Sequence, residues 1–542
     1  MDKKTIKNIL AELPFTVELD WILRHKSQPA GRFALKNLQA NLPDIMDQIK
    51  PFADDASKKT RQPKKIFIFA TLHYWIEQAT LLGLALAAKG HKVTLAYLPY
   101  GEWDKPLSRF DLRRQNIYAR QILQNTSPYM KTVSLLDVHP YLQPLPPDLA
   151  PIIEQVTRYD VQYTLQDEQV DSTCDLYHLR EERNQSAARS ALTWLKAHRP
   201  DVVIVPNGSI QEFGVVYRVA RYLNIPTVTY EFGDQRDRIW LAQNSEIMRH
   251  DTDAFWEARK ALPISDAEME RMQNLFSARQ QAIIWENFAR LWQGAPAEGA
   301  EQARGRLGLD ARPVALLATN VLGDSLTLGR QVFSKGMSDW IERTVQYFAG
   351  RKDLQLVIRV HPGESLTHGP SMVDVVHKAL PKLPEHIHLI GPLEKINTYD
   401  IVAVADIGLV YTTTVGMEMA MNGIPVIVTG QTHYRQRGFT FDPASWNSYF
   451  EHLDRLTDHP MQHRLSREQT RLAWQYAYRF FFDFPRPFPW HLLSLWSDFK
   501  EYPMSSVLSP EGSAQYDQTF KYLSGSPLDW KTIDQDSATR AQ

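Results

Sequence analysis

Two stretches of the sequence join a compact apolar run to a polar end, and they constrain the fold more than any other feature. One is Leu356-Val-Ile-Arg-Val-His-Pro, and the other is Val410-Tyr-Thr-Thr-Thr-Val-Gly, which leads into a helical pattern. An unbroken apolar run of this length is typical of a buried strand in a parallel sheet. A strand that passes through hydroxyl residues into a helix is a common place for phosphate in α/β folds. The two stretches therefore predict an α/β domain with a ligand site at the carboxyl ends of its strands.

Similar alternations of strand and helix fill both halves of the chain. Its 542 residues exceed what one hydrophobic core usually serves. We therefore predict an α/β protein with two Rossmann-like, parallel-sheet domains facing each other across a cleft, and helical extensions at both ends. The predicted boundaries are 1–60 for an N-terminal helical extension and linker, 61–262 for the first domain, 263–305 for a helical connection, 306–460 for the second domain, and 461–542 for C-terminal helices and a polar tail.

Composition excludes several classes of protein. The 61 basic and 62 acidic residues nearly cancel, so no overall charge attracts nucleic acid. No run approaches the ~20 apolar residues of a membrane span, and the N-terminus lacks a signal-peptide core, so we expect a cytoplasmic protein. The single cysteine, Cys174, rules out an intramolecular disulfide. We expect no metal, because no Asp-x-Asp follows a core strand and His386 and His388 lack further ligands nearby.

Polar residues that follow the strands of the second domain form the main candidate site. Arg359 and His361 lie two residues apart, so both side chains are expected on one face, where they can neutralise charge on a phosphate. The threonines stand where a helix begins, and the free N-H groups of its first turn can bind an anion. The alternatives are an ordinary threonine N-cap and a histidine that only packs before a proline turn. The predicted residues are Asn320, Arg359, His361, Thr412, Thr413 and Thr414.

Glu418 follows the threonines by one helical turn. A carboxylate at that distance can accept hydrogen bonds from both hydroxyls of a ribose. An ordinary surface residue of a helix is an equally good interpretation, and the spacing does not decide between them.

The first domain supplies a candidate general base. Glu231 follows the predicted strand that ends at Tyr230, so its carboxylate should project into the cleft, where burial can raise its pKa. Asp234 and Asp237 compete for this role, and a purely structural role for the loop is the third alternative. His73 and Asn207 also follow buried strands and are candidates for contact with an acceptor or a donor sugar.

Taken together, these residues resemble the capsule polysaccharide biosynthesis family. The resemblance rests on Arg-Val-His-Pro at 359–362, on the segment 412–427 with its threonines, Glu418 and Gly-Ile-Pro-Val-Ile, and on Gly-Gln-Thr-His-Tyr-Arg-Gln-Arg-Gly at 430–438. It covers mainly residues 314–443. That family contains GT-B glycosyltransferases related to the transferases of 3-deoxy-manno-octulosonic acid (Kdo), and it is similar in motif to bacterial sialyl- and polysialyltransferases.

The resemblance implies a role for several of the candidate residues. It places His361 and the three threonines at the donor phosphate, Glu418 near the ribose, and the general base on Glu231. The related sialyltransferases carry a second acidic residue where this chain has Phe232, so the match is incomplete at that position.

The function implied is a metal-independent, inverting glycosyltransferase that builds a surface or capsular polysaccharide. Its donor would be a nucleotide-sugar, with CMP-activated Kdo or a sialic acid-like sugar favoured, and its acceptor a glycan or glycolipid. No cofactor is implied beyond the nucleotide-sugar, and a peripheral contact with the plasma membrane or a capsule-assembly complex stays open. Two other hypotheses remain, a nucleotide-sugar 2-epimerase and a noncatalytic glycan-assembly protein on the same scaffold.

Overall fold

The structure is a computed structural model that describes most of the chain. The described residues are Lys7, Leu13, 15–24, 33–59, 62–138, 144–291, 293–367 and 369–531. The predicted polar tail from 534 to 542 and parts of the predicted N-terminal extension lie outside them. None of the described helices is both long and apolar enough to cross a membrane.

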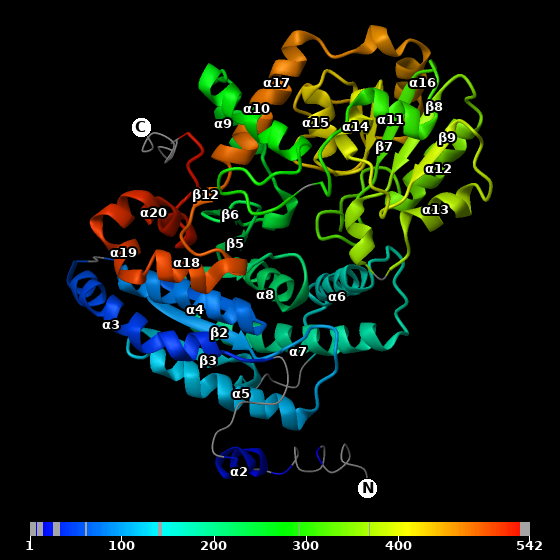
Figure 1. Cartoon of the computed structure of the whole chain (residues 1–542). Helices are drawn as coiled ribbons and strands as arrows, with labels where there is room; N and C mark the ends of the chain where they lie inside the picture. The colour runs from blue at the N-terminus through cyan, green and yellow to red at the C-terminus, as the bar shows by residue number, and fades with distance from the viewer. Residues whose placement is uncertain are drawn as a thin grey trace. The chain divides into compact units, whose positions relative to one another are not determined.

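The chain forms two compact units, each built from segments that are distant in sequence (Figure 1). Unit 1 comprises Met1–Asp160, Asp171–Met248 and Arg486–Asp529, and unit 2 comprises Val161–Val170, Arg249–Pro485 and Trp530–Gln542. The boundaries predicted from the sequence treat each domain as one continuous stretch. They therefore miss that residues 161–170 belong to unit 2 and residues 486–529 to unit 1. This assignment depends on contacts between segments that are far apart in the chain.

Unit 1 is centred on a seven-stranded sheet with the order β12-β6-β5-β4-β1-β2-β3. Its strands are β1 (Lys65–Thr71), β2 (Lys92–Leu98), β3 (Met130–Ser134), β4 (Val202–Pro206), β5 (Thr227–Glu231), β6 (Arg238–Gln243) and β12 (Arg486–Pro487). Strands β1 to β5 pair in parallel, as expected of the predicted parallel-sheet domain, although β3 itself was not predicted. Strands β6 and β12 add an antiparallel edge that the sequence did not predict.

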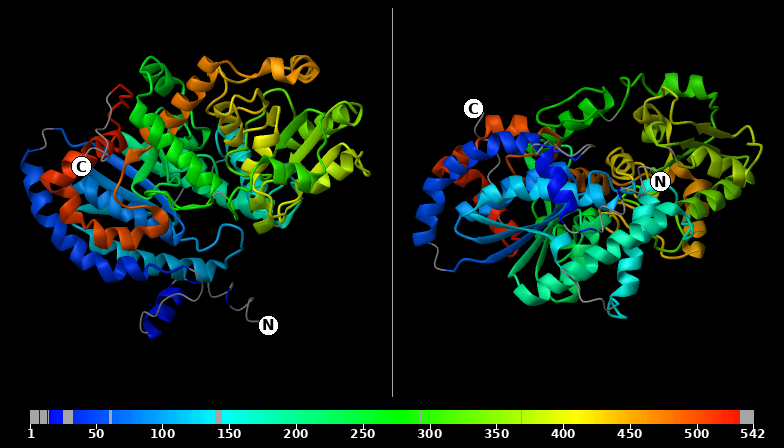
Figure 2. Two further views of the ribbon diagram at one scale, coloured as in Figure 1. Left: turned by 45° about the horizontal axis from the view of Figure 1, so that its top comes forward. Right: turned by 90° about the horizontal axis from the view of Figure 1, so that it is seen from below.

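Helices cover both faces of this sheet (Figure 2). The helices of unit 1 are α2 (Thr16–Leu23), α3 (Lys36–Lys59), α4 (His73–Ala88), α5 (Arg109–Leu123), α6 (Ala150–Leu165), which ends in unit 2, α7 (Asp175–His198), α8 (Gln211–Tyr222), α18 (Leu495–Glu501), α19 (Met504–Leu508) and α20 (Pro510–Leu523). Along β1, the Phe67 and Phe69 rings contact Trp194 of α7 and Phe213 of α8. Ile68 points to the other face, where Gly83 lets α4 approach so closely that a Cβ would lie 2.4 Å from the sulfur of Met130.

The loosely periodic apolar residues of 1–50 predict short helices, whereas the described residues 33–59 contain one helix of 24 residues, α3. Its buried positions include Leu38, Leu42, Ile45 and Ile49, which follow the period of an amphipathic helix. The basic residues Lys58 and Lys59 end this helix, although the sequence placed them in a linker.

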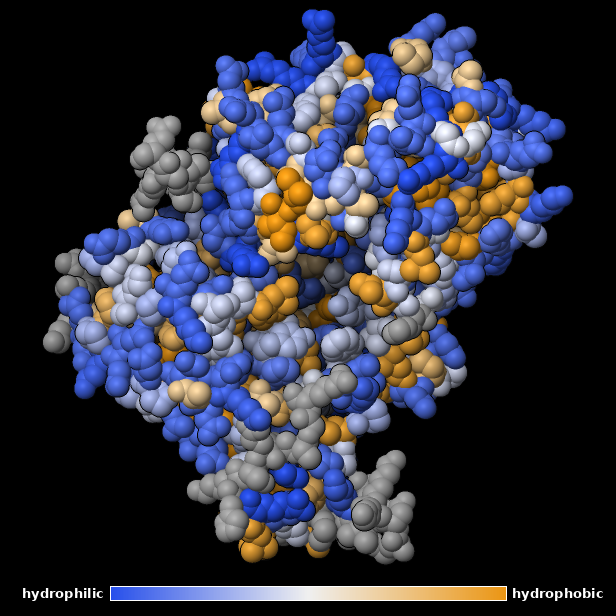
Figure 3. All heavy atoms as spheres, in the orientation of Figure 1, coloured by the Kyte–Doolittle hydropathy of each residue, from blue (hydrophilic) through white to orange (hydrophobic). Residues whose placement is uncertain are grey.

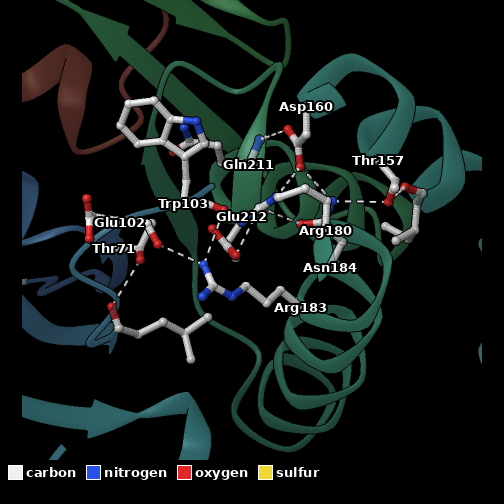
Figure 4. Close-up of polar contacts among 12 residues, drawn as sticks. Thr71, Glu102, Trp103, Thr157, Asp160, Arg180, Arg183, Asn184, Gln211 and Glu212 are labelled. Carbon is white, nitrogen blue, oxygen red and sulfur yellow. Dashed lines mark hydrogen bonds and ion pairs between the residues drawn. The ribbon is translucent and has the colours of Figure 1, made fainter. Parts of the chain in front are cut away.

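A buried polar network supports the helices of unit 1 (Figure 4). The guanidinium of Arg180 on α7 donates to the carboxylates of Asp160 (3.1 Å) and Glu212 (3.0 Å), and all three side chains are inaccessible to solvent. Asp160 also accepts from the N-H of Gln211, the first residue of α8. Arg180 further donates to the carbonyl of Trp103, in the loop after β2. The network therefore fixes the start of α8 and the loop after β2 to one point on α7.

Unit 2 has a five-stranded sheet that is parallel throughout, with the order β11-β10-β7-β8-β9. Its strands are β7 (Val314–Ala318), β8 (Gln355–Arg359), β9 (Ile387–Ile390), β10 (Ile407–Val410) and β11 (Val426–Val428). Its helices are α9 (Asp253–Arg259), α10 (Asp266–Gln280), α11 (Ala300–Leu307), α12 (Met337–Ala349), α13 (Met372–Ala379), α14 (Thr398–Val404), α15 (Val415–Met421), α16 (Trp446–Asp458) and α17 (Arg467–Tyr478), followed by a π-helix (Arg479–Asp483). The two sheets confirm the predicted α/β class with two Rossmann-like domains.

The predicted helical connection is helical only at its ends, in α10 and α11. Residues 281–291 between them are not helical. Helix α10 ends because Ala282 takes a left-handed conformation (φ 54°) and the N-H of Ile283 bonds back to the carbonyl of Ala278 at 3.0 Å.

Candidate functional site

In unit 1, the candidate residues lie around the point where the strand order reverses. From β1 the chain adds β2 and β3 on one side and then β4 and β5 on the other. Ligands of open α/β sheets bind beyond the carboxyl ends of the strands at such a reversal. His73 begins the helix after β1, Asn207 follows β4, and Glu231 is the last residue of β5. Three residues singled out from the sequence therefore follow neighbouring strands.

Asn207 and Glu231 are in direct contact. The side-chain amide of Asn207 donates to Oε2 of Glu231 at 3.2 Å. The amide oxygen of Asn207 accepts from the N-H of Ser209 at 3.0 Å, which fixes which end of the amide faces Glu231. Asn207 and Gly208 both have positive φ (57° and 83°), a conformation that asparagine and glycine adopt more easily than other residues. The Asn-Gly turn thus aims a hydrogen-bond donor at the carboxylate.

The environment of Glu231 suits a general base. Burial raises the pKa of Glu231 to about 7, although the hydrogen bonds from the N-H of Phe232 and from Asn207 oppose the shift. A base is most effective when its pKa lies near the working pH. The carboxyl group can therefore gain and lose a proton under physiological conditions.

Phe232, which stands where the related sialyltransferases have a second acid, belongs to an aromatic cluster. Its ring centroid lies 6.0 Å from both Trp75 and Phe488, and 5.0 Å from the ring of His491. Nε2 of His491 donates to the carbonyl of Gly233 at 3.1 Å, while its Nδ1 accepts from the N-H of Leu493. His491 thus anchors the loop that carries Glu231. Sequence reasoning missed it, because His491 lies 260 residues further along the chain.

His73 and Asp234, the other candidates of unit 1, are not in the contact between Asn207 and Glu231 described above. Nδ1 of His73 has no hydrogen-bond partner among the described residues, and burial lowers the pKa of this side chain. The carboxylate of Asp234 lies close enough to His491 to act on its pKa, which is lowered mainly by burial. Asp234 thus lies near His491. Its role as an alternative general base to Glu231 stays a prediction.

In unit 2, the strand order reverses between β7 and β10, and the predicted donor-side residues gather there. The N-H of Thr412, after β10, donates to the side-chain oxygen of Asn320, after β7, at 3.1 Å. The N-H of His361, after β8, donates to the hydroxyl of Thr319 at 3.0 Å. Neighbouring strand ends are therefore tied together by hydrogen bonds that involve Asn320, Thr412 and His361, all three singled out from the sequence.

His361 is a neutral hydrogen-bond donor at this edge. Its Nδ1 accepts from the N-H of Gly363 at 3.0 Å, so the proton of the neutral ring is assigned to Nε2. Burial, together with the nearby charges of Arg290 and Arg359, lowers the pKa of His361 to about 4. In this structure the ring therefore offers an N-H rather than a positive charge, and contact of His361 with a phosphate stays a prediction. Arg290, which was not predicted, brings a cation near this edge.

The three threonines do not form an ordinary N-cap. Thr414 is the N-cap residue of α15, but its side chain caps no backbone N-H. The hydroxyl of Thr412 is buried and has no hydrogen-bond partner among the described residues. The carbonyl of Thr413 accepts from the hydroxyl of Tyr434 at 2.5 Å, and this contact requires Gly416, where a Cβ would lie 2.4 Å from the tyrosine oxygen. The backbone of the turn is therefore fixed, and binding of a phosphate by the three threonines stays a prediction.

Arg359 and Glu418 are engaged with the protein instead. The two terminal nitrogens of Arg359 donate to the carbonyls of Gly391 (2.9 Å) and Ile396 (3.2 Å). Glu418 is almost completely buried, pairs with Arg279 at 2.7 Å, and accepts from the hydroxyl of Tyr399 at 3.1 Å. Glu418 is thus not a surface residue, and its contact with a ribose stays a prediction.

The described residues contain no group of three or more His, Cys, Asp or Glu side chains arranged to hold a metal ion. Metal independence stays a prediction, because a metal can also be held by the substrate.

The fold and the site define a class of two-domain, Rossmann-like proteins with polar residues at the reversal point of each sheet. No family model and no curated protein matches the chain. Several solved structures are similar to it. The chain is similar to Thermosulfurimonas dismutans KpsC, beta Kdo 2,4 transferase, at 17% identity, covering 53% of this chain and 82% of that one with a TM-score of 0.36.

The chain is also similar to two solved structures of proteins other than KpsC. UDP-GlcNAc 2-epimerase from Neisseria meningitidis is 14% identical, with 78% of this chain and 99% of that one covered and a TM-score of 0.26. MurG from Acinetobacter baumannii is 12% identical, with 76% and 95% covered and a TM-score of 0.25. At such low identities and TM-scores, these likenesses decide neither the family nor the activity of this chain.

Proposed function

We propose that this protein is an inverting, metal-independent glycosyltransferase of the GT-B type that extends a surface or capsular polysaccharide. The observation that supports it most is Glu231, a carboxyl group at the reversal point of the unit 1 sheet with a pKa raised to about 7. A base with such a pKa is what the activation of a sugar hydroxyl requires. The motif resemblance favours a CMP-activated Kdo or sialic acid-like donor and a glycan or glycolipid acceptor in the cytoplasm.

In this proposal Glu231 starts the reaction. Its carboxylate removes the proton from an acceptor hydroxyl as the oxygen attacks the anomeric carbon of the donor sugar. The bond between that carbon and the phosphate oxygen breaks, and the nucleotide leaves with the electron pair. The amide of Asn207 holds the carboxylate in place, and the attack from the face opposite the leaving group inverts the anomeric configuration.

Unit 2 supplies the groups that receive the leaving phosphate. The Nε2-H of His361 and the hydroxyl of Thr412 are donors without a fixed protein acceptor in the described residues, and the first turn of α15 presents backbone N-H groups. Donors placed where negative charge develops stabilise the transition state more than the ground state. Arg290 adds a positive charge near His361.

The class of reaction is tested by incubating the protein with CMP-, UDP- and GDP-sugars, with and without oligosaccharide acceptors. We expect acceptor-dependent release of CMP and an elongated acceptor, with equal activity after treatment with a chelator. An isomerised donor without transfer indicates an epimerase. Absence of turnover with every donor indicates a noncatalytic protein, and loss of activity with the chelator contradicts metal independence.

His361→Ala is expected to lower kcat by about 10²-fold to 10³-fold, the typical cost of removing one donor to a developing anion. His361→Gln, which keeps an N-H donor, should recover part of this loss. The exposed His377→Ala on α13 is a matched control and should behave as the wild type. Steady-state kinetics measures the effect, and unchanged turnover in His361→Ala would remove this residue from the mechanism.

A further inference from the structure

Among the described residues, helix α2 packs on unit 1 through the face that carries its buried side chains. Val17 and Trp21 are its buried residues. Val17 packs with Phe110 and Ile117 of α5, and the Trp21 ring lies 6.1 Å from the ring of Tyr118. These contacts fix which side of the helix is turned to the body of the unit.

The opposite face of α2 is apolar and exposed. Leu19, Ile22 and Leu23 are 56%, 62% and 75% exposed, and Phe15 at the start of the helix is 73% exposed. The spacing of the three aliphatic residues is i, i+3, i+4, which puts them on one side of a helix. Other strongly exposed apolar residues, such as Leu393 and Met461, do not share a helix face. Figure 3 shows apolar side chains near α2 at the foot of the view. Large apolar side chains gathered on one exposed face mark an interaction surface.

The size of this face argues against a dimer of the chain. With about 200 Å² for each fully exposed large side chain, the four residues offer roughly 500 Å². A stable interface between proteins buries about 800 Å² on each partner. A lipid surface needs no matching groove and accepts a short helix that inserts only its apolar side chains.

The charges around the helix fit an anionic surface. The two acidic residues of α2 are already paired, Glu18 with Arg113 at 2.9 Å and Asp20 with Arg24 at 2.8 Å. The first 32 residues contain six Lys and Arg and four Asp and Glu, whereas the whole chain has a net charge of -1. A basic excess in the sequence that flanks an apolar helix is attracted to anionic lipid.

We propose that this α2 face, formed by Phe15, Leu19, Ile22 and Leu23, docks the protein on an anionic lipid bilayer. The inserted side chains give up their contact with water, and the basic excess in the sequence of the first 32 residues favours an anionic bilayer over a neutral one. The surface does not depend on the proposed transferase activity, because lipid binding is measured without donor or acceptor.

The test is co-sedimentation of the full chain with vesicles of phosphatidylcholine and phosphatidylglycerol, compared with pure phosphatidylcholine. We expect binding to the mixed vesicles and weaker binding to the neutral ones. Leu19→Glu combined with Ile22→Glu should lower the partition coefficient at least about tenfold, because two charges replace inserted apolar side chains. Leu393→Glu combined with Met461→Glu makes the same change at isolated exposed positions and should bind as the wild type.

Circular dichroism and thermal unfolding check that the α2 variant keeps its fold, since both substituted residues are exposed. Failure of the wild type to bind the mixed vesicles overturns the proposal, and so does equal binding to pure phosphatidylcholine. The proposal is also overturned if the α2 variant binds the mixed vesicles as strongly as the wild type does. If light scattering shows a wild-type dimer that the α2 variant dissociates, the face joins copies of the chain and the lipid proposal is wrong.

Discussion

Glu231→Gln should nearly abolish glycosyl transfer, with kcat lowered at least about 10²-fold and as much as about 10⁴-fold, the range of general base catalysis. Glutamine has the shape of glutamate but cannot accept a proton at neutral pH. The N-H of Phe232, which bonds the carboxylate at 3.1 Å, still finds an oxygen in the amide, whereas the side-chain amide of Asn207 loses its acceptor. The main loss should therefore lie in kcat, while the stability of the protein falls by only about 1 kcal/mol and the binding of CMP, measured by thermal shift, changes little.

The pH profile distinguishes loss of the base from a structural effect. The pKa of Glu231 is raised to about 7, and the active form is the carboxylate. Wild-type kcat/KM should therefore be constant above this pKa and fall about tenfold for each pH unit below it. The residual rate of Glu231→Gln should lack that step. Asp234→Asn is the matched control, and if it abolishes transfer while Glu231→Gln does not, the base is Asp234.

Local patterns in the sequence predict the parallel sheets and most of the candidate residues at the carboxyl ends of their strands. The buried strands read as apolar runs, and polar residues placed directly after them must meet where the carboxyl ends of parallel strands lie together. This is why Asn320, Thr412 and His361 could be grouped before their contacts were known. The same reasoning placed Asn207 and Glu231 at one edge, although it did not predict their hydrogen bond.

Side-chain direction and long-range pairing could not be predicted in this way. Arg359 reaches the carbonyl groups of two loops, and Glu418 pairs with Arg279, which lies 139 residues earlier in the chain. No local pattern contains these partners. Strand β12 has only two residues, too few for any periodic signal, and His491 reaches the Glu231 loop only because that strand places it there.

Arg180→Met is expected to destabilise unit 1 by about 3–5 kcal/mol, the usual cost of breaking a buried ion pair by removing one partner. Arg180 is fully buried and lies between Asp160 and Glu212 (Figure 4). Methionine fills a similar volume but leaves two carboxylates without their cation. Urea unfolding should show a midpoint at a clearly lower concentration. The exposed pair of Lys105 and Glu102 serves as the control, and Lys105→Met should cost less than about 1 kcal/mol.

The pH dependence of this loss identifies its cause. Burial raises the pKa of Asp160, and Arg180 opposes that shift, so removal of Arg180 raises the pKa further. A carboxyl group whose folded pKa is raised destabilises the fold as the pH rises above its unfolded pKa. The loss in the free energy of unfolding caused by Arg180→Met should therefore be smallest in acid and grow as the pH rises. Combining Arg180→Met with Asp160→Asn and Glu212→Gln removes every charge of the triad and should recover most of the stability. A deficit that is independent of pH and persists in the triple variant instead means that the packing of the Arg180 side chain, and not its charge, holds α7 and α8 together.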